Sequence, residues 1–450
     1  MDVVEERRVR TDFQRLADEV AARIADGSLR PGERLPTQRA YARRRGVAPS
    51  TATRVYQELG RRGLVTGEVG RGTFVRAAPA DGQERGGPAL AEPALARIDL
   101  ELNYPVTPGQ AALLARPLSA LLRPDAFDAA LRPLGAAGTP PARTRFAQLS
   151  AHAGWAPEPD AILFAANARQ ATAAALAALV PTGGRLGVEA LTYPVVKGLA
   201  RRLGVTLVPL PMDEQGPDPA ALASVHLDAP LHAVYLQPRV HNPLGVSWAP
   251  ERCAALADVL ADGRIPVIED AVWSFLAPDP GPLAALLPEQ VVLVDSLSKR
   301  LAPGLAVGFL VVPETLRPAL AGALRATAAP PGAFALEAAV RWIGEGTADR
   351  IAADKRADAA ARQQIAHAVL AGHRLRAHPG SYYVWWELPE PWRAETFAAA
   401  ALEHGIAITP GSAFAADPRS NPRAVRVGLA SPPPDLLERA LVTLATIAAG

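Results

Sequence analysis

Apolar residues in the first 75 positions recur at helical spacing and then give way to two short strand-like segments. The first helical pattern is carried by Phe13, Leu16, Val20 and Ile24. It ends at Asp26-Gly27, and two further helices are predicted over about 37–45 and 50–61. Residues 64–66 and 73–75 are predicted strands around a glycine-rich tip. Three helices followed by this hairpin predict a winged helix-turn-helix.

From about residue 96 onward, short apolar segments alternate with helices rich in Ala and Leu. The predicted strands are 162–164, 186–189, 206–209, 233–236, 267–270, 291–295 and 306–311. They lack polar alternation, as buried and largely parallel strands do. A three-layer α/β/α domain is therefore expected. Beyond about 320, a long helix over about 347–371, strands at 382–387 and 424–428 and a last helix predict a smaller α/β domain.

These patterns divide the 450 residues into four parts. Residues 1–76 form the predicted winged helix domain, and 77–95, which are Ala, Pro, Gly and polar, form a linker without an apolar pattern. The large α/β domain is expected over 96–320 and the small domain over 321–450. Two or three domains suit a chain of this length.

Composition and charge narrow the class of protein. The longest apolar stretch, 161–180, is interrupted by Asn167, Arg169 and Gln170, and the first eight residues lack the apolar core of a signal peptide. The single cysteine, Cys253, excludes an intramolecular disulfide and a cysteine-based metal cluster. We therefore expect a cytoplasmic protein with no metal site.

Charge is placed unevenly along the chain. The net charge is +2, but residues 1–76 contain 16 Arg and 10 Asp or Glu, a net of +6, which leaves −4 for the remainder. A basic N-terminal domain on a mildly acidic body predicts contact with a polyanion.

Candidate DNA contacts lie on the third predicted helix and on the wing. The helix begins with Ser50, Thr51, Thr53 and Arg54, whose side chains can reach phosphates and base edges from a major groove. Arg39 near the second helix, and Gly70 and Arg71 at the tip of the wing, are further candidates. The alternative is a solvated arginine-rich face on an accessory helical domain.

Two motifs strengthen the DNA-binding interpretation. Gly-Ser-Leu-Arg-Pro-Gly-Glu-Arg-Leu-Pro-Thr-Gln-Arg at 27–39 and Gly-Arg-Gly-Thr-Phe-Val at 70–75 closely resemble regulators of the GntR type. Pro49 departs from that pattern, since many members have a DNA-contacting arginine there. Base readout by other residues is therefore expected.

Lysine is rare in this chain and is placed selectively. Only Lys197, Lys299 and Lys355 are lysines, so 44 of the 47 basic residues are arginine. Lys299 follows an apolar run that predicts a buried strand. A desolvated lysine amine can form a Schiff base, which a permanently protonated guanidinium cannot. The alternative is a solvent-exposed lysine at the end of a strand.

Lys299 ends the last of four short motifs that follow one another along the body. They are Asn-Ala-Arg-Gln at 167–170, Asn-Pro-Leu-Gly at 242–245, Ile-Glu-Asp at 268–270 and Ser-Leu-Ser-Lys at 296–299. In this order and spacing, residues 98–448 resemble fold-type I pyridoxal-phosphate aminotransferases. Behind a GntR-type head, the whole chain resembles the MocR class of transcriptional regulators.

The resemblance implies a role for several residues toward pyridoxal phosphate. Lys299 would bind its aldehyde, Asp270 would pair with the pyridinium nitrogen, and Asn242 would donate to the ring hydroxyl. The backbone of Ala168 and Arg169, at a helix N-terminus, would cradle the phosphate. Ordinary structural roles, as a strand-end acid, an Asn-Pro turn or a β-to-α turn, remain the alternatives.

Two further positions match the aminotransferase pattern less specifically. Tyr193 matches an aromatic residue near the face of the cofactor ring, with core packing as the alternative. Arg426 matches the arginine that binds a substrate carboxylate, for which bidentate pairing is suited. A surface arginine on a strand is the alternative for Arg426.

Two departures put cofactor binding in doubt. Ala306 stands where the family usually has a phosphate-binding arginine, and Trp273 stands where a tyrosine usually contacts the ring hydroxyl. Each lost charge-assisted bond is worth roughly 1.5–3 kcal/mol. Ser296, Ser298 and Arg300 are candidates to compensate for them.

Three functions follow from these patterns. The favoured one is a homodimeric regulator that binds a DNA operator and senses an amino acid or amine through pyridoxal phosphate on Lys299. The second is a working aminotransferase with an appended DNA-binding domain, against which Ala306 and Trp273 argue. The third is a regulator that has lost the cofactor and senses something else or only dimerises.

Overall fold

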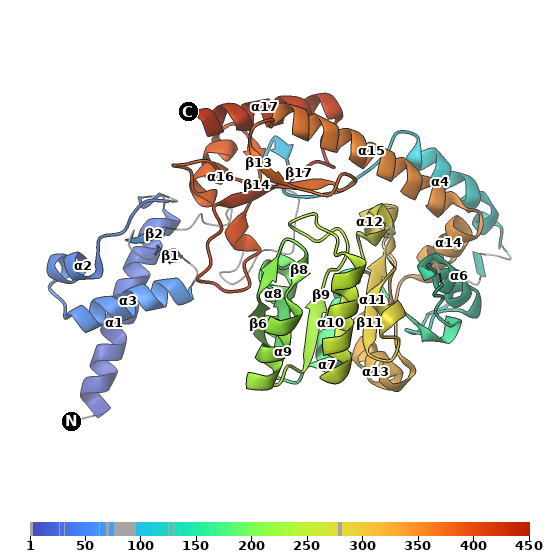
Figure 1. The fold of residues 1–450 in the computed structure, drawn as a ribbon, viewed down its shortest axis with the longest axis horizontal. Coiled ribbons are helices and arrows are strands. Elements are labelled where there is room, and N and C mark those ends of the chain that lie inside the picture. Colours follow the sequence, from blue (N-terminus) through green and yellow to red (C-terminus); the bar gives the residue numbers. More distant parts are fainter. Residues whose placement is uncertain are drawn as a thin grey trace.

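The structure is a computed structural model in which an N-terminal helical domain stands beside a larger α/β body (Figure 1). It describes residues 3–26, 28–30, 32–62, 64–68, 72–75, 96–124, 127–128, 131–152, 154–277 and 281–450. The predicted linker, 77–95, lies outside these residues. Among the described residues, no helix combines the length and apolar character needed to cross a membrane.

The N-terminal domain has the predicted three helices and hairpin. Its elements are α1 (Val3–Ala25), α2 (Gln38–Arg45), α3 (Pro49–Arg61), β1 (Val65–Glu68) and β2 (Gly72–Val75). Thr37 caps α2 by accepting the amide of Ala40 at 3.2 Å, and Gly46 ends the helix with φ +64°. Strands β1 and β2 pair antiparallel. The apolar stripe of α1 packs with α3 and the hairpin in one buried core.

A seven-stranded mixed sheet forms the centre of the body. Its strands are β4 (Ile162–Ala165), β5 (Arg185–Glu189), β6 (Thr206–Leu210), β9 (Ala233–Leu236), β10 (Val267–Asp270), β11 (Val291–Ser296) and β12 (Gly308–Val311). They follow the order β4-β12-β11-β10-β9-β5-β6. Only β12 runs antiparallel to its neighbours. The largely parallel arrangement is confirmed, and the strands are mostly buried, except that only Leu210 is buried in the edge strand β6.

Helices cover both faces of this sheet. Those of the large body are α4 (Gln110–Leu118), α6 (Pro140–Ser150), α7 (Ala168–Leu179), α8 (Pro194–Arg202), α9 (Pro219–Asp228), α10 (Pro250–Asp262), α11 (Leu283–Leu286), α12 (Leu297–Arg300), α13 (Arg317–Thr327) and α14 (Ala333–Gly344), beside the short hairpin of β7 (Met212–Asp213) and β8 (Gly216–Pro217). Neighbouring strand residues enter opposite cores. Val267 packs in one cluster and Ile268 in the other.

A smaller α/β domain completes the body. Its elements are β3 (Ile98–Asp99), α15 (Thr347–Val369), β13 (Arg374–Arg376), β14 (Tyr383–Glu387), α16 (Ala394–Glu403), β15 (Ile406–Ala407), β16 (Thr409–Pro410), β17 (Ala424–Gly428) and α17 (Pro434–Ala449). The sheet order is β13-β14-β17-β16. Figure 1 shows this domain over one end of the large sheet.

The hydrophobic cores of the body do not follow the domain boundary that the sequence predicts. The large-domain cluster continues past residue 320, because Leu336 and Trp342 of α14 pack in it. The indole nitrogen of Trp342 also donates to the carbonyl of Leu114 in α4 at 2.9 Å. In the other direction, Leu100 belongs to the core of the small domain. The expected boundary at 320 therefore falls inside a continuously packed region.

Candidate functional site

The four motifs meet where the carboxyl ends of β9, β10 and β11 face the small domain. Parallel strands end at the same edge of a sheet, so the segments that follow them lie close together. Asp270 ends β10, and Lys299 lies in α12 directly after β11. Arg426 reaches the same place from β17 and donates to Asn242 at 2.9 Å. Side chains from both domains thus form one site.

Lys299 is held between aromatic rings and a main-chain acceptor. Its Nζ donates to the carbonyl of Asn103 at 2.6 Å. It lies 4.5 Å from the ring centre of Tyr104 and 5.2 Å from that of Trp273. Burial lowers the pKa of Lys299 to about 7, and the charges of Arg426, Arg169 and Lys355 act in the same direction. A neutral, nucleophilic amine is therefore accessible near neutral pH.

Asp270 is a half-buried carboxylate within a hydrogen-bond network. Burial raises its pKa to about 6, opposed by a hydrogen bond from Tyr235 and by the amide of Val272. Gln237 donates to the Tyr235 hydroxyl at 2.9 Å and accepts the amide of Asn242 at 2.9 Å. One network therefore ties the carboxylate to the Asn242 loop. Tyr235 and Gln237 could not be recognised from the sequence, because they lie in and directly after an apolar strand without a motif of their own.

Arg426 is a buried cation without an ionic partner. Its guanidinium donates to Asn242, to the carbonyl of Glu101 and to Thr409 at 3.2 Å, and lies 4.9 Å from the ring centre of Phe414. No ion pair involves Arg426 among the described residues, although the charges of Glu101 and Asp99 act on it, and its Nε has no hydrogen-bond partner there. Burying a charge is costly unless it is paired, so the site favours an anionic ligand.

The first turn of α7 forms a close backbone cradle. Asn167 caps the helix by accepting the amide of Gln170 at 3.0 Å, and Ala168 is its first residue. A Cβ added to Gly308 would lie 2.3 Å from the carbonyl carbon of Asn167. Gly308 pairs with Ser296, whose hydroxyl accepts the amide of Ser298 at 2.9 Å. The structure thus brings the predicted phosphate turn and the two serines together.

Tyr193 and Trp273 have different neighbours in this site. Burial raises the pKa of the Tyr193 hydroxyl, and a hydrogen bond and the charge of Arg169 oppose that shift. Trp273 lies beside Lys299 and packs edge-on against Tyr383, with ring centres 5.8 Å apart. Trp273 therefore lies beside the amine. Unlike a tyrosine, it has no hydroxyl group to offer to the cofactor.

The other two lysines bind carbonyls at the junction of the domains. Lys355 of α15 is fully buried and donates to the carbonyls of Lys299, at 2.8 Å, and Leu301. Lys197 of α8 donates to the carbonyl of Ala413 at 2.7 Å. Both contacts join a large-domain segment to a small-domain segment. The sequence did not single out either role, since a charged run such as Asp354-Lys355-Arg356 usually lies on a surface.

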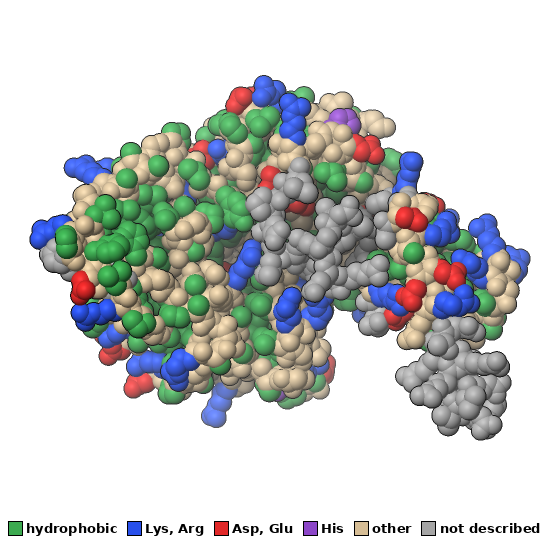
Figure 2. Space-filling view, turned by 180° about the vertical axis from the view of Figure 1, so that it is seen from behind, with side chains coloured by type: hydrophobic (Ala, Val, Ile, Leu, Met, Phe, Trp, Pro, Cys, Tyr) green, Lys and Arg blue, Asp and Glu red, His purple; other side chains and the backbone are tan. Residues whose placement is uncertain are grey.

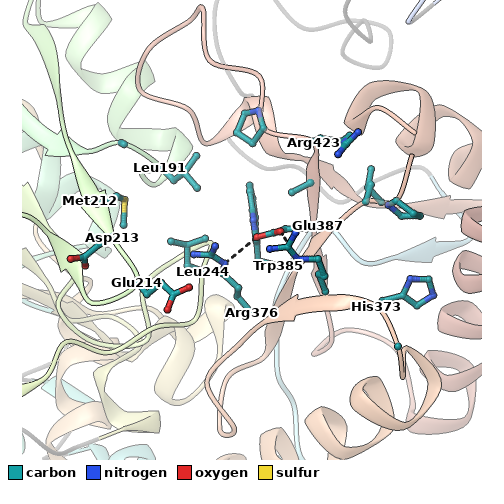
Figure 3. Close-up of a pocket in the computed structure, with 17 residues that line it drawn as sticks. Leu191, Met212, Asp213, Glu214, Leu244, His373, Arg376, Trp385, Glu387 and Arg423 are labelled. Atoms are coloured by element: carbon teal, nitrogen blue, oxygen red, sulfur yellow. Dashed lines mark hydrogen bonds and ion pairs between the residues drawn. The ribbon is translucent and has the colours of Figure 1, made fainter. Parts of the chain in front are cut away.

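A cleft of about 780 Å³ adjoins the site between the two domains (Figure 3). Leu191 and Leu244 line it and lie two residues along the chain from Tyr193 and Asn242. On the small-domain side, Arg376 donates to Glu387 at 3.1 Å across the cleft wall. The cleft offers a space next to the site, and the arginines in its lining, Arg374, Arg376 and Arg423, are paired with Glu387 or Glu390.

The candidate DNA contacts lie on an exposed face of the N-terminal domain. Arg39, Ser50 and Arg54 are exposed, whereas Thr51 and Thr53 are half-buried. The hydroxyl of Thr53 interacts within the domain, with Gln38 at 2.9 Å and the carbonyl of Pro49 at 3.1 Å. Gly70 and Arg71 lie outside the described residues.

Comparisons with known proteins match both parts of the chain. The family model of aminotransferase class I and II matches residues 99–444, and that of bacterial regulatory proteins of the gntR family matches 13–75. The HTH-type transcriptional regulator YdeF of Bacillus subtilis is 27% identical over 423 residues, covering 93% of this chain and 90% of that protein. The HTH-type pyridoxine biosynthesis transcriptional regulator PdxR of Corynebacterium glutamicum is 26% identical over 356 residues, covering 74% and 73%.

The solved structures agree with the fold of the body. An archaeal alanine:glyoxylate aminotransferase superimposes with a TM-score of 0.71 at 21% identity, covering 78% of this chain and 90% of its own. That likeness concerns the fold alone. The winged helix of the GntR type implies DNA binding. The chain belongs to the aminotransferase class I and II family and carries a GntR-type DNA-binding domain, the organisation of MocR-type transcriptional regulators.

Proposed function

We propose that this regulator binds pyridoxal phosphate at Lys299 and responds to an amino acid or another amine bound beside it. The observation that carries the proposal is that the half-buried amine of Lys299, held between two aromatic rings, shares its site with Arg426, a buried arginine that forms no ion pair among the described residues. When bound, pyridoxal phosphate supplies an aldehyde that condenses with amines and an electron-withdrawing ring. The protein would supply position, charge and exclusion of water.

The residues of the site fit this cofactor. Lys299 offers the amine, Asp270 the carboxylate for a protonated ring nitrogen, and Asn242 an amide beside the ring. The turn at Asn167 and Ala168 offers free helix amides to a phosphate, with Gly308 leaving no room for a side chain there. Ala306 and Trp273 weaken this fit without removing any of these groups.

Arg426 is proposed to bind the carboxylate of the effector. Its hydrogen bond to Asn242 places an effector-binding group in direct contact with a cofactor-binding group. Binding of an anion at Arg426 would therefore change the surroundings of the ring and of Lys299 together. For such binding to alter DNA recognition, the effector must favour one arrangement of the DNA-binding domains over another.

The chain is further proposed to act as a homodimer on double-stranded DNA. Leu122 and Leu131 are 66% and 69% exposed, and Phe127 and Phe334 contact each other with ring centres 6.1 Å apart. Figure 2 shows hydrophobic side chains gathered on the end of the molecule away from the N-terminal domain. Exposed apolar patches of this kind mark interaction sites. A dimer would present two winged helices to paired half-sites.

The visible absorbance spectrum tests the cofactor proposal. The purified protein and Lys299→Ala are titrated with pyridoxal phosphate, followed by a screen of amines and amino acids. A visible band that requires Lys299 and shifts when an amine is added is expected. If the parent protein shows no such band at saturating cofactor, the chain has lost the cofactor and the proposal fails. Sustained keto-acid formation would instead indicate an aminotransferase.

A further inference from the structure

The cradle at the start of α7 leaves open which side chain neutralises a bound phosphate. Ala306 carries no charge. Arg300 follows Lys299 but turns elsewhere, with its guanidinium 3.3 Å from the carboxylate of Asp295 and 5.3 Å from the ring centre of Phe275. Arg300, a candidate from the sequence, is therefore already paired. A dianion bound by helix amides alone would lack a cationic partner.

Position 306 lies close to the cradle. Gly308, two residues later, contacts the Asn167–Ala168 turn so closely that no Cβ fits. It also pairs with Ser296, which places β12 and the serines against the same turn. The positive charge that an arginine at position 306 would supply is therefore missing near this turn. A cationic side chain on the turn itself could reach the same space.

Arg169 is such a cation. It is the second residue of α7, directly after Ala168, and is half-buried. Its guanidinium interacts with the Tyr193 hydroxyl, and its positive charge contributes to the lowered pKa of Lys299. Arg169 lies in the first turn of α7, beside the Asn167–Ala168 turn, and from there its side chain can reach the same space. The next side chain, Gln170, turns away and accepts the amide of Ala329 at 3.2 Å.

We infer that Arg169 binds the phosphate of the cofactor through its side chain and replaces a cation at position 306. The inference rests on the proposed binding of pyridoxal phosphate. A guanidinium presents two parallel donors to phosphate oxygens, which makes the contact stronger than a backbone amide alone. The phosphate would also neutralise the charge that Arg169 directs at Lys299.

Comparing pyridoxal phosphate with pyridoxal, which lacks only the phosphate, isolates this contact. Dissociation constants for both are taken from the Lys299-dependent absorbance band in the parent protein, Arg169→Gln, Arg169→Lys and Arg169→Gln with Ala306→Arg. Arg202→Gln, an exposed arginine on α8, is the matched control. Circular dichroism checks that each variant is folded.

Arg169→Gln is expected to weaken the binding of pyridoxal phosphate by about 10- to 100-fold and to change the binding of pyridoxal little. Arg169→Lys should keep part of the preference for the phosphate, and Ala306→Arg should restore much of it in the Gln variant. Equal weakening of both ligands, or an unchanged preference, would overturn the inference while leaving the cofactor proposal intact. Absence of a Lys299-dependent band with either ligand in the parent would instead defeat the cofactor proposal.

Discussion

A lysine amine attacks a carbonyl only when it is neutral, and the surroundings of Lys299 favour that form. Burial is the main cause of its lowered pKa, and the neighbouring charges of Arg426 and Arg169 add to it. The carbonyl of Asn103 accepts a hydrogen bond from the amine whether it is neutral or charged. The ring faces of Tyr104 and Trp273 attract an ammonium ion, so the lowered pKa means that burial outweighs this attraction.

The rate of band formation with pyridoxal phosphate should therefore rise between pH 6 and 8 and level off above a pKa of about 7. The sign follows from the lowered pKa, because deprotonation of Lys299 creates the nucleophile. Stopped-flow absorbance measures the rate, and pyridoxal controls for titration of the phosphate. A rate that keeps rising by about tenfold per pH unit through pH 9 would show an ordinary lysine pKa instead.

At the residue scale, the sequence was informative where a motif follows a buried strand. Lys299, Asp270 and Asn242 could be predicted this way, and the structure brings all three together. Tyr235 and Lys355 could not be predicted, because their roles depend on contacts across 35 and 54–56 residues of chain. Only the folded arrangement shows that a strand tyrosine reaches Asp270.

Among the elements, α15 has a direct influence on the lysine segment. Lys355 is fully buried, and its amine donates to the carbonyls of Lys299 and Leu301 at the end of α12. Burial lowers the pKa of Lys355 to about 7, so it can lie in the core without a permanent charge. Helix α15 thereby fixes the backbone from which the Lys299 side chain extends.

Lys355→Met should destabilise the body by about 1–3 kcal/mol, because two buried carbonyls lose their donor while most of the side-chain volume remains. Urea unfolding followed by tryptophan fluorescence measures the change. All seven tryptophans lie beyond residue 150, so the signal reports on the body. Arg350→Met, at an exposed position of the same helix, is the control. Equal stability of both variants and the parent would contradict the proposed anchoring.

Neighbouring side chains of α3 differ in whether they are bonded within the domain or exposed to solvent. Thr53 interacts with Gln38 and so supports the packing of α3 against α2. Arg54 is exposed beside it and is free to contact DNA. The sequence grouped these residues as DNA contacts, and only the structure separates a residue bonded within the domain from one that faces outward.

Arg54→Ala is expected to weaken operator binding by about tenfold or more and to reduce its salt dependence, since a contact to DNA is lost. The Lys299-dependent absorbance band should remain unchanged. Fluorescence anisotropy with a labelled operator at several salt concentrations measures both effects, and Arg325→Ala, at an exposed position of α13, is the control. Unchanged binding at moderate salt would show that α3 is not the reading helix.

At the scale of the whole molecule, apolar exposure is concentrated far from the DNA-binding domain. Figure 1 places α4 and α14 at the end opposite that domain, and Figure 2 shows hydrophobic side chains gathered there. Leu122, Leu131 and Phe334 belong to this part of the chain. A contact between two copies at this end would cover the apolar surface and leave both winged helices accessible.

Leu131→Glu should therefore shift the protein from dimer to monomer, because a dimer would have to bury the new carboxylate against apolar side chains. Light scattering after size exclusion gives the mass directly, at several protein concentrations. Leu227→Glu is the matched control, since Leu227 is 82% exposed on α9, outside this surface. If both variants remain dimers, another surface holds the two copies together. If Leu131→Glu alone becomes monomeric, its operator affinity should fall as well, because a single winged helix can contact only one half-site at a time.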